Sequence, residues 1–306
     1  MENVYAGKWL KAPKNLLFAV SERVARITLN RPERRNALSN ELLQELRDAF
    51  FEADDRTDVN VILLDGAGRD FCSGYDMKSV YDKRAREELT TQSTESVDYR
   101  KSYGNFDDDC WNIERYMACS AVISELHKPV IAKVHGNCLA GGTDLALRCD
   151  VVVAAEDARI GFPATRAQGS PPSHMWIYHC GPQWAKRLLL TGDLISGRDA
   201  AKIGLVMDAV PAAELEEFAT GLAGRIALVD SDLAATQKRI VNVALEAMGV
   251  SLLQRLAVEN DARAHLGTGP RRSRYKSDMA QHGMKEALKN RDAGFGDSLV
   301  ELRSKG

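Results

Sequence analysis

The stretch that decides the fold is His135-Gly136-Asn137-Cys138-Leu139-Ala140-Gly141-Gly142-Thr143-Asp144-Leu145-Ala146-Leu147-Arg148-Cys149-Asp150. The apolar run Pro129 to Val134 leads into it, and a second run, Val151 to Ala155, follows it. This pattern predicts a strand, a glycine turn, a short helix and another strand. The first N–H groups of a helix have no partner inside it, and paired glycines leave them open to approach. The turn can therefore hold a developing negative charge.

A second turn of the same kind lies earlier in the chain. The segment Phe71-Cys72-Ser73-Gly74-Tyr75-Asp76 follows the strand-like run Val61 to Asp65. Two N–H donors, one from each turn, would form an oxyanion hole, which stabilises negative charge on an oxygen atom.

Composition excludes several classes of protein. The chain has 306 residues, 44% of them hydrophobic, enough for one main domain with an appendage. A net charge of -2 gives no basic field for nucleic acid. No apolar run approaches the roughly 18 residues of a membrane helix, and no signal-peptide core precedes residue 14. We expect a cytoplasmic protein with no membrane partner, no metal site and six reduced cysteines.

The order of the predicted elements indicates an α/β fold. Strand patterns and helical patterns alternate first, and helical periodicity dominates from about residue 212 onward. Residues 77–128 carry no strand signal and are rich in charged residues until a helical pattern near their end. Long connections of this kind are usually lids or binding loops.

Several motifs together resemble the crotonase, or enoyl-CoA hydratase/isomerase, superfamily. They occur in the family's order over roughly residues 15–230, which makes chance a poor explanation. The motifs are Asn30-Arg31-Pro32 to Asn36-Ala37-Leu38; Phe71 to Asp76; Lys128-Pro129-Val130-Ile131-Ala132; His135-Gly136 to Gly141-Gly142-Thr143-Asp144-Leu145-Ala146; Cys149-Asp150; Leu190-Thr191-Gly192-Asp193; and Ala200 to Gly204-Leu205-Val206.

The resemblance implies a crotonase-like spiral of ββα units with a helical C-terminal region. Residues 1–230 would form the spiral core, with 77–128 as a long variable insertion. Residues 231–306 would form a helical trimerisation region. The expected assembly is a homotrimer or a dimer of trimers.

The resemblance also implies that a coenzyme A thioester binds as the substrate, so no separate cofactor is expected. The thioester oxygen would lie between the N–H groups of Tyr75 and Gly141. One such donor is typically worth about 2.7–4 kcal/mol in catalysis. Arginine suits the CoA phosphates because its guanidinium is planar and always charged. The residues expected to bind CoA are Arg34, Arg35, Ala37, Ser73, Asp76 and Met77.

The acid–base residues depart from the family pattern. Hydratases of the family use two carboxylates; the first position is Asp144 here, and the second is Ala164, which cannot transfer a proton. The family's glycine-rich turn is replaced by a segment, 171–176, that contains His174. An imidazole with a near-neutral pKa can take or give a proton, so Asp144 and His174 are the catalytic candidates. Lesser candidates are Tyr178, His179 and the acidic run Asp107 to Asp109.

Each of these residues also has a structural interpretation. Asp144 lies in the first turn of the predicted helix, where a carboxylate interacts favourably with the helix dipole. His174 is more often a packed or hydrogen-bonded residue than a base.

Three functions remain open at this point. The leading hypothesis is an acyl-CoA-dependent enzyme that acts through a thioester enolate, in the degradation of lipids or ring compounds. The second is a carbon–carbon hydrolase, decarboxylase or isomerase on a bulky or cyclic acyl-CoA, favoured by the long insertion and the rebuilt turn. The third is a CoA-ester-binding protein with little catalysis, because the second carboxylate is missing.

Overall fold

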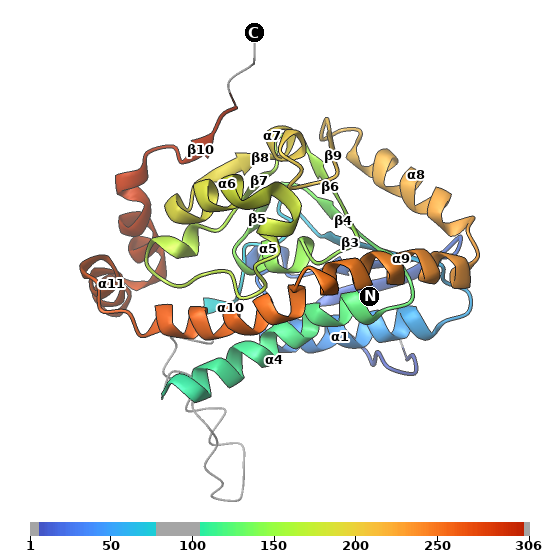
Figure 1. Cartoon of the computed structure of the whole chain (residues 1–306), viewed down its shortest axis with the longest axis horizontal. Coiled ribbons are helices and arrows are strands. Elements are labelled where there is room, and N and C mark those ends of the chain that lie inside the picture. Colours follow the sequence, from blue (N-terminus) through green and yellow to red (C-terminus); the bar gives the residue numbers. More distant parts are fainter. Residues whose placement is uncertain (1–5, 78–104, 303–306) are drawn as a thin grey trace, which may run out of the picture.

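Two β-sheets form the core of the molecule (Figure 1). The computed structural model describes residues 6–77 and 105–302. Its strands are β1 (Leu16–Ser21), β2 (Val24–Leu29), β3 (Val61–Gly66), β4 (Val130–Val134), β5 (Asn137–Leu139), β6 (Val151–Ala155), β7 (Arg159–Gly161), β8 (Leu194–Ser196), β9 (Asp208–Val210) and β10 (Leu299–Val300). The larger sheet has the order β1-β2-β3-β4-β6-β9, and the smaller has the order β10-β8-β7-β5.

The helices cover these sheets and form the C-terminal third of the chain. They are η1 (Pro32–Arg34), α1 (Asn40–Asp55), α4 (Phe106–Glu125), α5 (Gly141–Ala146), η2 (Pro163–Arg166), α6 (Trp176–Thr191), α7 (Gly197–Lys202), α8 (Leu215–Ala227), α9 (Ser231–Ala247), α10 (Val250–His265), α11 (Pro270–Asp292) and η3 (Ala293–Phe295). In Figure 1, α1, α4 and α10 lie along one side of the core, and α4 contacts both of the others.

The chain passes from one sheet to the other in a repeating way. Strand β4 belongs to the larger sheet, β5 to the smaller sheet, and α5 follows; β6, β7 and η2 repeat this passage. Strands β3 and β4 are buried along their whole length, which explains their largely apolar sequences; the charged exceptions, Asp65 and Lys133, pair with each other (3.1 Å). The predicted α/β fold with a spiral of ββα units and a helical C-terminal region is confirmed.

Local sequence signals set several element ends. The Ser39 hydroxyl accepts a hydrogen bond from the N–H of Leu42 and so caps the N-terminus of α1. Helix α6 begins at Trp176. Its helical backbone is interrupted at Gly181 (φ 73°), so Pro182 opens the second half, and Gly192 ends it in a left-handed conformation.

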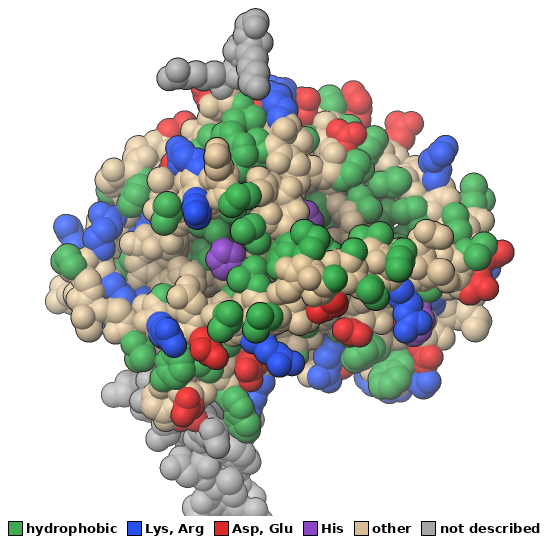
Figure 2. Space-filling model, viewed as in Figure 1, with side chains coloured by type: hydrophobic (Ala, Val, Ile, Leu, Met, Phe, Trp, Pro, Cys, Tyr) green, Lys and Arg blue, Asp and Glu red, His purple; other side chains and the backbone are tan. Residues whose placement is uncertain are grey.

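Helices α9 and α10 carry apolar side chains on their outer surface. Figure 2 shows hydrophobic side chains scattered over the face that carries these helices. The exposed members are Leu233, Ile240, Val241, Val243, Leu252 and Leu256. Within residues 6–77 and 105–302, no single helix has both the length and the apolar composition to cross a membrane. Only α9 and α10 taken together pass by length and composition, and they are bent by 59° at their junction.

Candidate active site

The two glycine turns predicted from the sequence meet in the structure. The Leu139 N–H donates to the Cys72 carbonyl (2.9 Å), and the Cys72 N–H donates to the Asn137 carbonyl (3.0 Å). Gly74 lies in this contact with a φ of 107°. A Cβ atom at Gly74 would lie 3.1 Å from the Leu139 carbonyl oxygen and 3.4 Å from the Gly141 nitrogen. Glycine is therefore required here by both the backbone conformation and the close approach of the turns.

The two predicted oxyanion donors have free N–H groups. Gly141 is the first residue of α5, so its N–H has no partner inside the helix. Among the residues that the structure describes, neither this N–H nor that of Tyr75 donates a hydrogen bond. A Cβ at Gly141 would lie 2.8 Å from the Tyr75 ring, so the two residues are in direct contact.

Asp144 lies next to these donors and is 1% exposed. Its Oδ1 atom accepts hydrogen bonds from the Ser173 hydroxyl (2.5 Å) and the Ser173 N–H (3.3 Å). Its Oδ2 atom accepts a hydrogen bond from the Tyr75 hydroxyl (3.4 Å). The structure therefore brings Tyr75, Gly141 and Asp144 together, as the sequence predicts.

The surroundings of Asp144 favour a protonated carboxyl. Burial raises the pKa of Asp144 to about 7, and the hydrogen bonds from Ser173 oppose this rise. The guanidinium of Arg148 lowers the same pKa, but it is itself buried, and burial lowers the pKa of Arg148. A carboxyl that titrates near pH 7 can both accept and donate a proton.

Ser173, whose N–H and hydroxyl both donate to the candidate catalytic carboxyl, is not among the site residues that the sequence predicts. The two residues are 29 positions apart, so no local spacing connects them. The sequence feature that could have indicated Ser173 is its position next to Pro171-Pro172, in the segment that departs from the family pattern.

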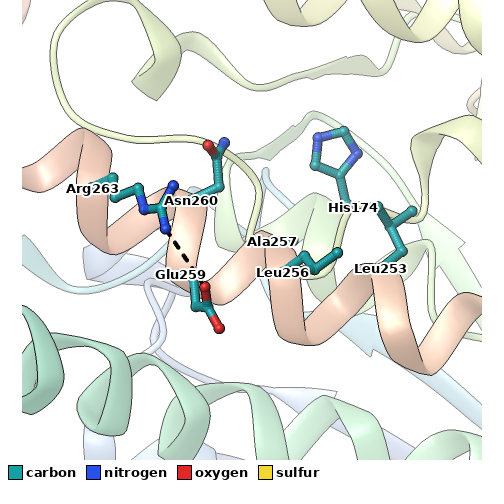
Figure 3. Close-up of a pocket in the computed structure, with 7 residues that line it drawn as sticks. All are labelled: His174, Leu253, Leu256, Ala257, Glu259, Asn260 and Arg263. Atoms are coloured by element: carbon teal, nitrogen blue, oxygen red, sulfur yellow. Dashed lines mark ion pairs between the residues drawn. The ribbon is translucent and has the colours of Figure 1, made fainter.

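His174 lies on the wall of a cavity of about 330 Å³ (Figure 3). Its φ of 50° is uncommon for a residue other than glycine. Burial lowers the pKa of its imidazole, and Nδ1 is buried with no hydrogen-bond partner among the described residues. The imidazole makes no hydrogen bond to Asp144 within that part of the chain, so its catalytic role stays a prediction. The other lining residues belong to α10: Leu253, Leu256, Ala257, Glu259, Asn260 and Arg263.

The lesser candidates have other partners. His179 Nε2 lies 2.8 Å from a backbone carbonyl oxygen, and the Tyr178 hydroxyl donates to another carbonyl at 3.3 Å. Asp107 is exposed at the start of α4. Asp109 is 1% exposed, and its Oδ2 lies 2.8 Å from Nδ1 of His265. The Asp108 carboxylate accepts a hydrogen bond from the Asn105 amide (2.7 Å). None of these contacts places a lesser candidate against Asp144.

Ala164 lies in η2, beside the altered turn. Its carbonyl oxygen accepts the N–H groups of Gln168 (2.7 Å) and Gly169 (3.2 Å). Its backbone therefore folds the following loop back on itself, while its methyl group supplies no proton donor or acceptor.

The predicted CoA-binding residues lie on two segments that meet. The Ser73 N–H donates to the Arg35 carbonyl (3.0 Å), and the Ser73 hydroxyl lies 3.5 Å from the Arg34 carbonyl. Both arginine side chains are exposed, and the Arg35 guanidinium lies 4.0 Å from the Asp70 carboxylate.

The remaining members of that set, Ala37, Asp76 and Met77, lie beside the same contact and are half-buried. The Asp76 carboxylate pairs with the Arg31 guanidinium (2.8 Å). This pairing neutralises a negative charge that would otherwise repel phosphate. Residues 78–104 of the predicted insertion lie outside the described residues.

Comparisons with known proteins show which family the chain resembles. The family model described as enoyl-CoA hydratase/isomerase matches residues 24–258. The crystal structure of enoyl-CoA hydratase from Mycobacterium smegmatis superimposes with a TM-score of 0.81 and 36% identity, covering 93% of this chain and 95% of that one. The 2,3-dehydroadipyl-CoA hydratase of Escherichia coli K12 is 32% identical over 69% of this chain and 75% of its own length. The crotonyl-CoA hydratase of Syntrophomonas wolfei is 30% identical over 82% of this chain and 89% of its own length.

The fold and the match together define an enzyme of the crotonase superfamily. The chain belongs to the enoyl-CoA hydratase/isomerase family, whose members are lyases or isomerases that act on acyl-CoA thioesters.

Proposed function

We propose that the protein hydrates the double bond of an enoyl-CoA through a thioester enolate. The observation that carries this proposal is the juxtaposition of two N–H groups, from Tyr75 and Gly141, with the buried carboxyl of Asp144; neither N–H donates a hydrogen bond within the described part of the chain. A thioester oxygen between the two donors would gain negative charge as the enolate forms. A carboxyl beside it would supply the proton transfers.

In the proposed reaction, ionised Asp144 takes a proton from water while the water oxygen attacks the β-carbon. The π electrons of the double bond move onto the thioester oxygen, where the N–H groups of Tyr75 and Gly141 stabilise the charge. Protonated Asp144 then returns the proton to the α-carbon, and the carbonyl re-forms. The net change is the addition of one water, with Asp144 restored.

Double-bond isomerisation is the second candidate, and Ala164 favours it. Moving a double bond requires one group to remove a proton from one carbon and return it to another. Asp144 alone can do both, whereas hydratases of the family use two carboxylates. For either reaction, we propose a metabolic role in the degradation of lipids or ring compounds, in the cytoplasm.

The test is mass spectrometry of an acyl-CoA panel incubated with the pure protein. The panel contains short and long enoyl-CoAs and cyclic β-keto acyl-CoAs. A gain of one water on an enoyl-CoA is the expected result, and a change of retention time at constant mass would indicate isomerisation. Ring opening or loss of carbon dioxide would contradict both and favour hydrolase or decarboxylase chemistry. Binding of CoA esters with no change of mass or retention would favour a binding protein.

We also propose that residues 231–306 contribute to self-association, as a homotrimer or a dimer of trimers. The support is the exposed apolar surface of α9 and α10, because large apolar patches commonly mark interfaces. Light scattering coupled to gel filtration should give a mass three or six times that of the chain. Replacing Ile240 and Val243 by lysine should reduce it, whereas a lysine at the exposed Leu190 on α6 should not. A monomeric wild-type protein would contradict this proposal.

A further inference from the structure

The turn formed by Ser170-Pro171-Pro172-Ser173 holds a buried carboxyl at each end. At one end, the N–H and hydroxyl of Ser173 donate to Asp144. At the other end, the Ser170 N–H donates to Oδ1 of Asp261 (2.8 Å). Asp261 lies on α10 and is 6% exposed. A movement of Asp261 relative to the turn would therefore be transmitted to Asp144 through four residues, two of which are conformationally restricted prolines.

Asp261 is fixed by contacts from its own helix and from the loop. Its Oδ1 lies 3.6 Å from Nε2 of His265, one helical turn away. A Cβ atom at Gly169 would lie 2.2 Å from the same Oδ1, so the absence of a side chain there is what admits the carboxyl. The Asn260 amide lies 3.4 Å from the Ser170 hydroxyl and adds a weak contact between α10 and the turn (Figure 3 shows Asn260 on α10).

His265 connects Asp261 to a third buried carboxyl. Its Nδ1 lies 2.8 Å from Oδ2 of Asp109, which belongs to α4 and is 1% exposed. The other oxygen of Asp109 is buried with no hydrogen-bond partner among residues 6–77 and 105–302. Burying carboxyl groups in this way is costly unless the groups are paired, so the arrangement is not explained by packing alone. The reaction proposed above uses none of these three side chains directly.

We propose that Asp261, held by His265 and Asp109, is a positioning residue for Asp144 that acts through the Ser170–Ser173 turn. This inference rests on the proposed function, because it assigns Asp261 a role only if Asp144 is the group that transfers protons. In this proposal, the turn that replaces the family's glycine-rich segment couples the C-terminal helix α10 to the reacting carboxyl.

The charge of Asp261 determines the direction in which this residue shifts the pKa of Asp144. Its negative charge raises the pKa of Asp144, and burial raises the pKa of Asp261 itself to about 6. The titratable and charged groups that face this pair are Asp109 on α4, His265 on α10, Arg272 on α11 and Arg148 beyond α5. The two arginines act in the opposite direction to the carboxylates: Arg272 lowers the pKa of Asp261, and Arg148 lowers the pKa of Asp144. Removing the charge at residue 261 should therefore lower the pKa of Asp144.

Asp261→Asn and Asp261→Ala separate charge from anchoring. The amide oxygen of asparagine can still accept the Ser170 N–H, whereas alanine removes both the charge and the acceptor. For Asp261→Asn, the rise of kcat/KM with pH should move about half a pH unit to lower pH. For Asp261→Ala, kcat should also fall about tenfold because the turn is released. Asp107→Asn is the matched control, since it makes the same change at an exposed residue of α4 and should move neither quantity.

A second measurement keeps this inference separate from the proposed function. Carbon-13 NMR of labelled aspartate, with the Asp144 signal assigned by its loss in Asp144→Asn, gives the Asp144 titration without any turnover. A lower Asp144 pKa in Asp261→Asn supports the coupling even if no enoyl-CoA is hydrated, in which case only the proposed function fails. An unchanged titration in Asp261→Asn overturns the inference, whatever the activity. If Asp261→Asn does not fold, His265→Gln tests the same coupling, with a smaller shift in the same direction expected.

Discussion

The two halves of the candidate site differ in the groups that form them: one half uses the backbone, and the other uses a side chain. The oxyanion half consists of backbone N–H groups on two turns, which are joined by hydrogen bonds from the Leu139 N–H to the Cys72 carbonyl and from the Cys72 N–H to the Asn137 carbonyl. The carboxyl half consists of the side chain of Asp144, which accepts two hydrogen bonds from Ser173 and one from the Tyr75 hydroxyl. The first half requires only glycines at two turns. The second requires side chains from distant segments, so it is the half in which a member of the family can change without losing the fold.

The largest expected effect is on the carboxyl half. Asp144→Asn should lower kcat about 10²–10⁴-fold, because the amide cannot exchange a proton with water or the α-carbon. The Kd for an acyl-CoA, measured by calorimetry, should change little because the amide is isosteric. Turnover at the wild-type rate would show that Asp144 is structural and that the base lies elsewhere.

The matching change in the oxyanion half is Gly141→Pro, which removes one N–H donor. Loss of one such donor costs about 10²–10³-fold in kcat. Gly141→Ala is the control: it keeps the N–H but places a Cβ close to the Tyr75 ring, so it reports the cost of crowding alone. Equal losses of kcat in the two variants would contradict the role of the N–H group.

The pH dependence of the free energy of unfolding distinguishes the carboxyl half from the oxyanion half, because the Asp144 carboxyl titrates and the backbone N–H groups do not. Burial raises the folded-state pKa of Asp144 to about 7, whereas an unfolded aspartate titrates near ~3.9. The protonated group therefore stabilises the fold fully below about pH 4, and this contribution is lost as the pH rises to about 7. Relative to wild type, Asp144→Asn should gain about 2–4 kcal/mol in the free energy of unfolding between pH 4 and pH 8. Urea denaturation at both values checks this; a pH-independent difference would contradict it.

The smallest expected effect comes from removing the hydrogen bonds that Ser173 donates to the Asp144 carboxyl. The Ser173 hydrogen bonds lower the pKa of Asp144, so Ser173→Ala should move the rise of kcat/KM to higher pH. This direction is opposite to that expected for Asp261→Asn. The loss in kcat/KM at pH 7 should be about tenfold, and Ser173→Thr should restore most of it by returning the hydroxyl. A fall in activity without a shift along the pH axis would indicate a packing role only.

The same division explains what the sequence could predict. The α/β spiral and the turns at Gly74 and Gly141 follow from apolar runs and glycine patterns that are local in the chain. The residues that surround Asp144 do not, because Ser173 is 29 positions from it and Asp261 is 91 positions from Ser170. His174 carries the more reactive side chain of the altered segment and is therefore the residue that the sequence indicates, whereas the neighbouring Ser173 makes the contact.

Helix α4 gives a second example. Its apolar spacing predicted a helix near the end of the 77–128 segment, and the structure places that helix at Phe106–Glu125. The acidic run Asp107 to Asp109 reads as a solvated helix start, yet Asp109 is buried against His265. Three adjacent residues of one helix face different directions, and only tertiary packing decides which of them is enclosed.

The most direct test of the central claim is hydration of a short enoyl-CoA in deuterated water, followed by mass spectrometry. If Asp144 transfers protons to an enolate held by Tyr75 and Gly141, the wild-type product contains the elements of water and one deuterium at the α-carbon. Asp144→Asn should form neither this product nor α-deuterated substrate, while it still binds the CoA ester. Hydration with α-deuteration at the wild-type rate in Asp144→Asn would contradict the account.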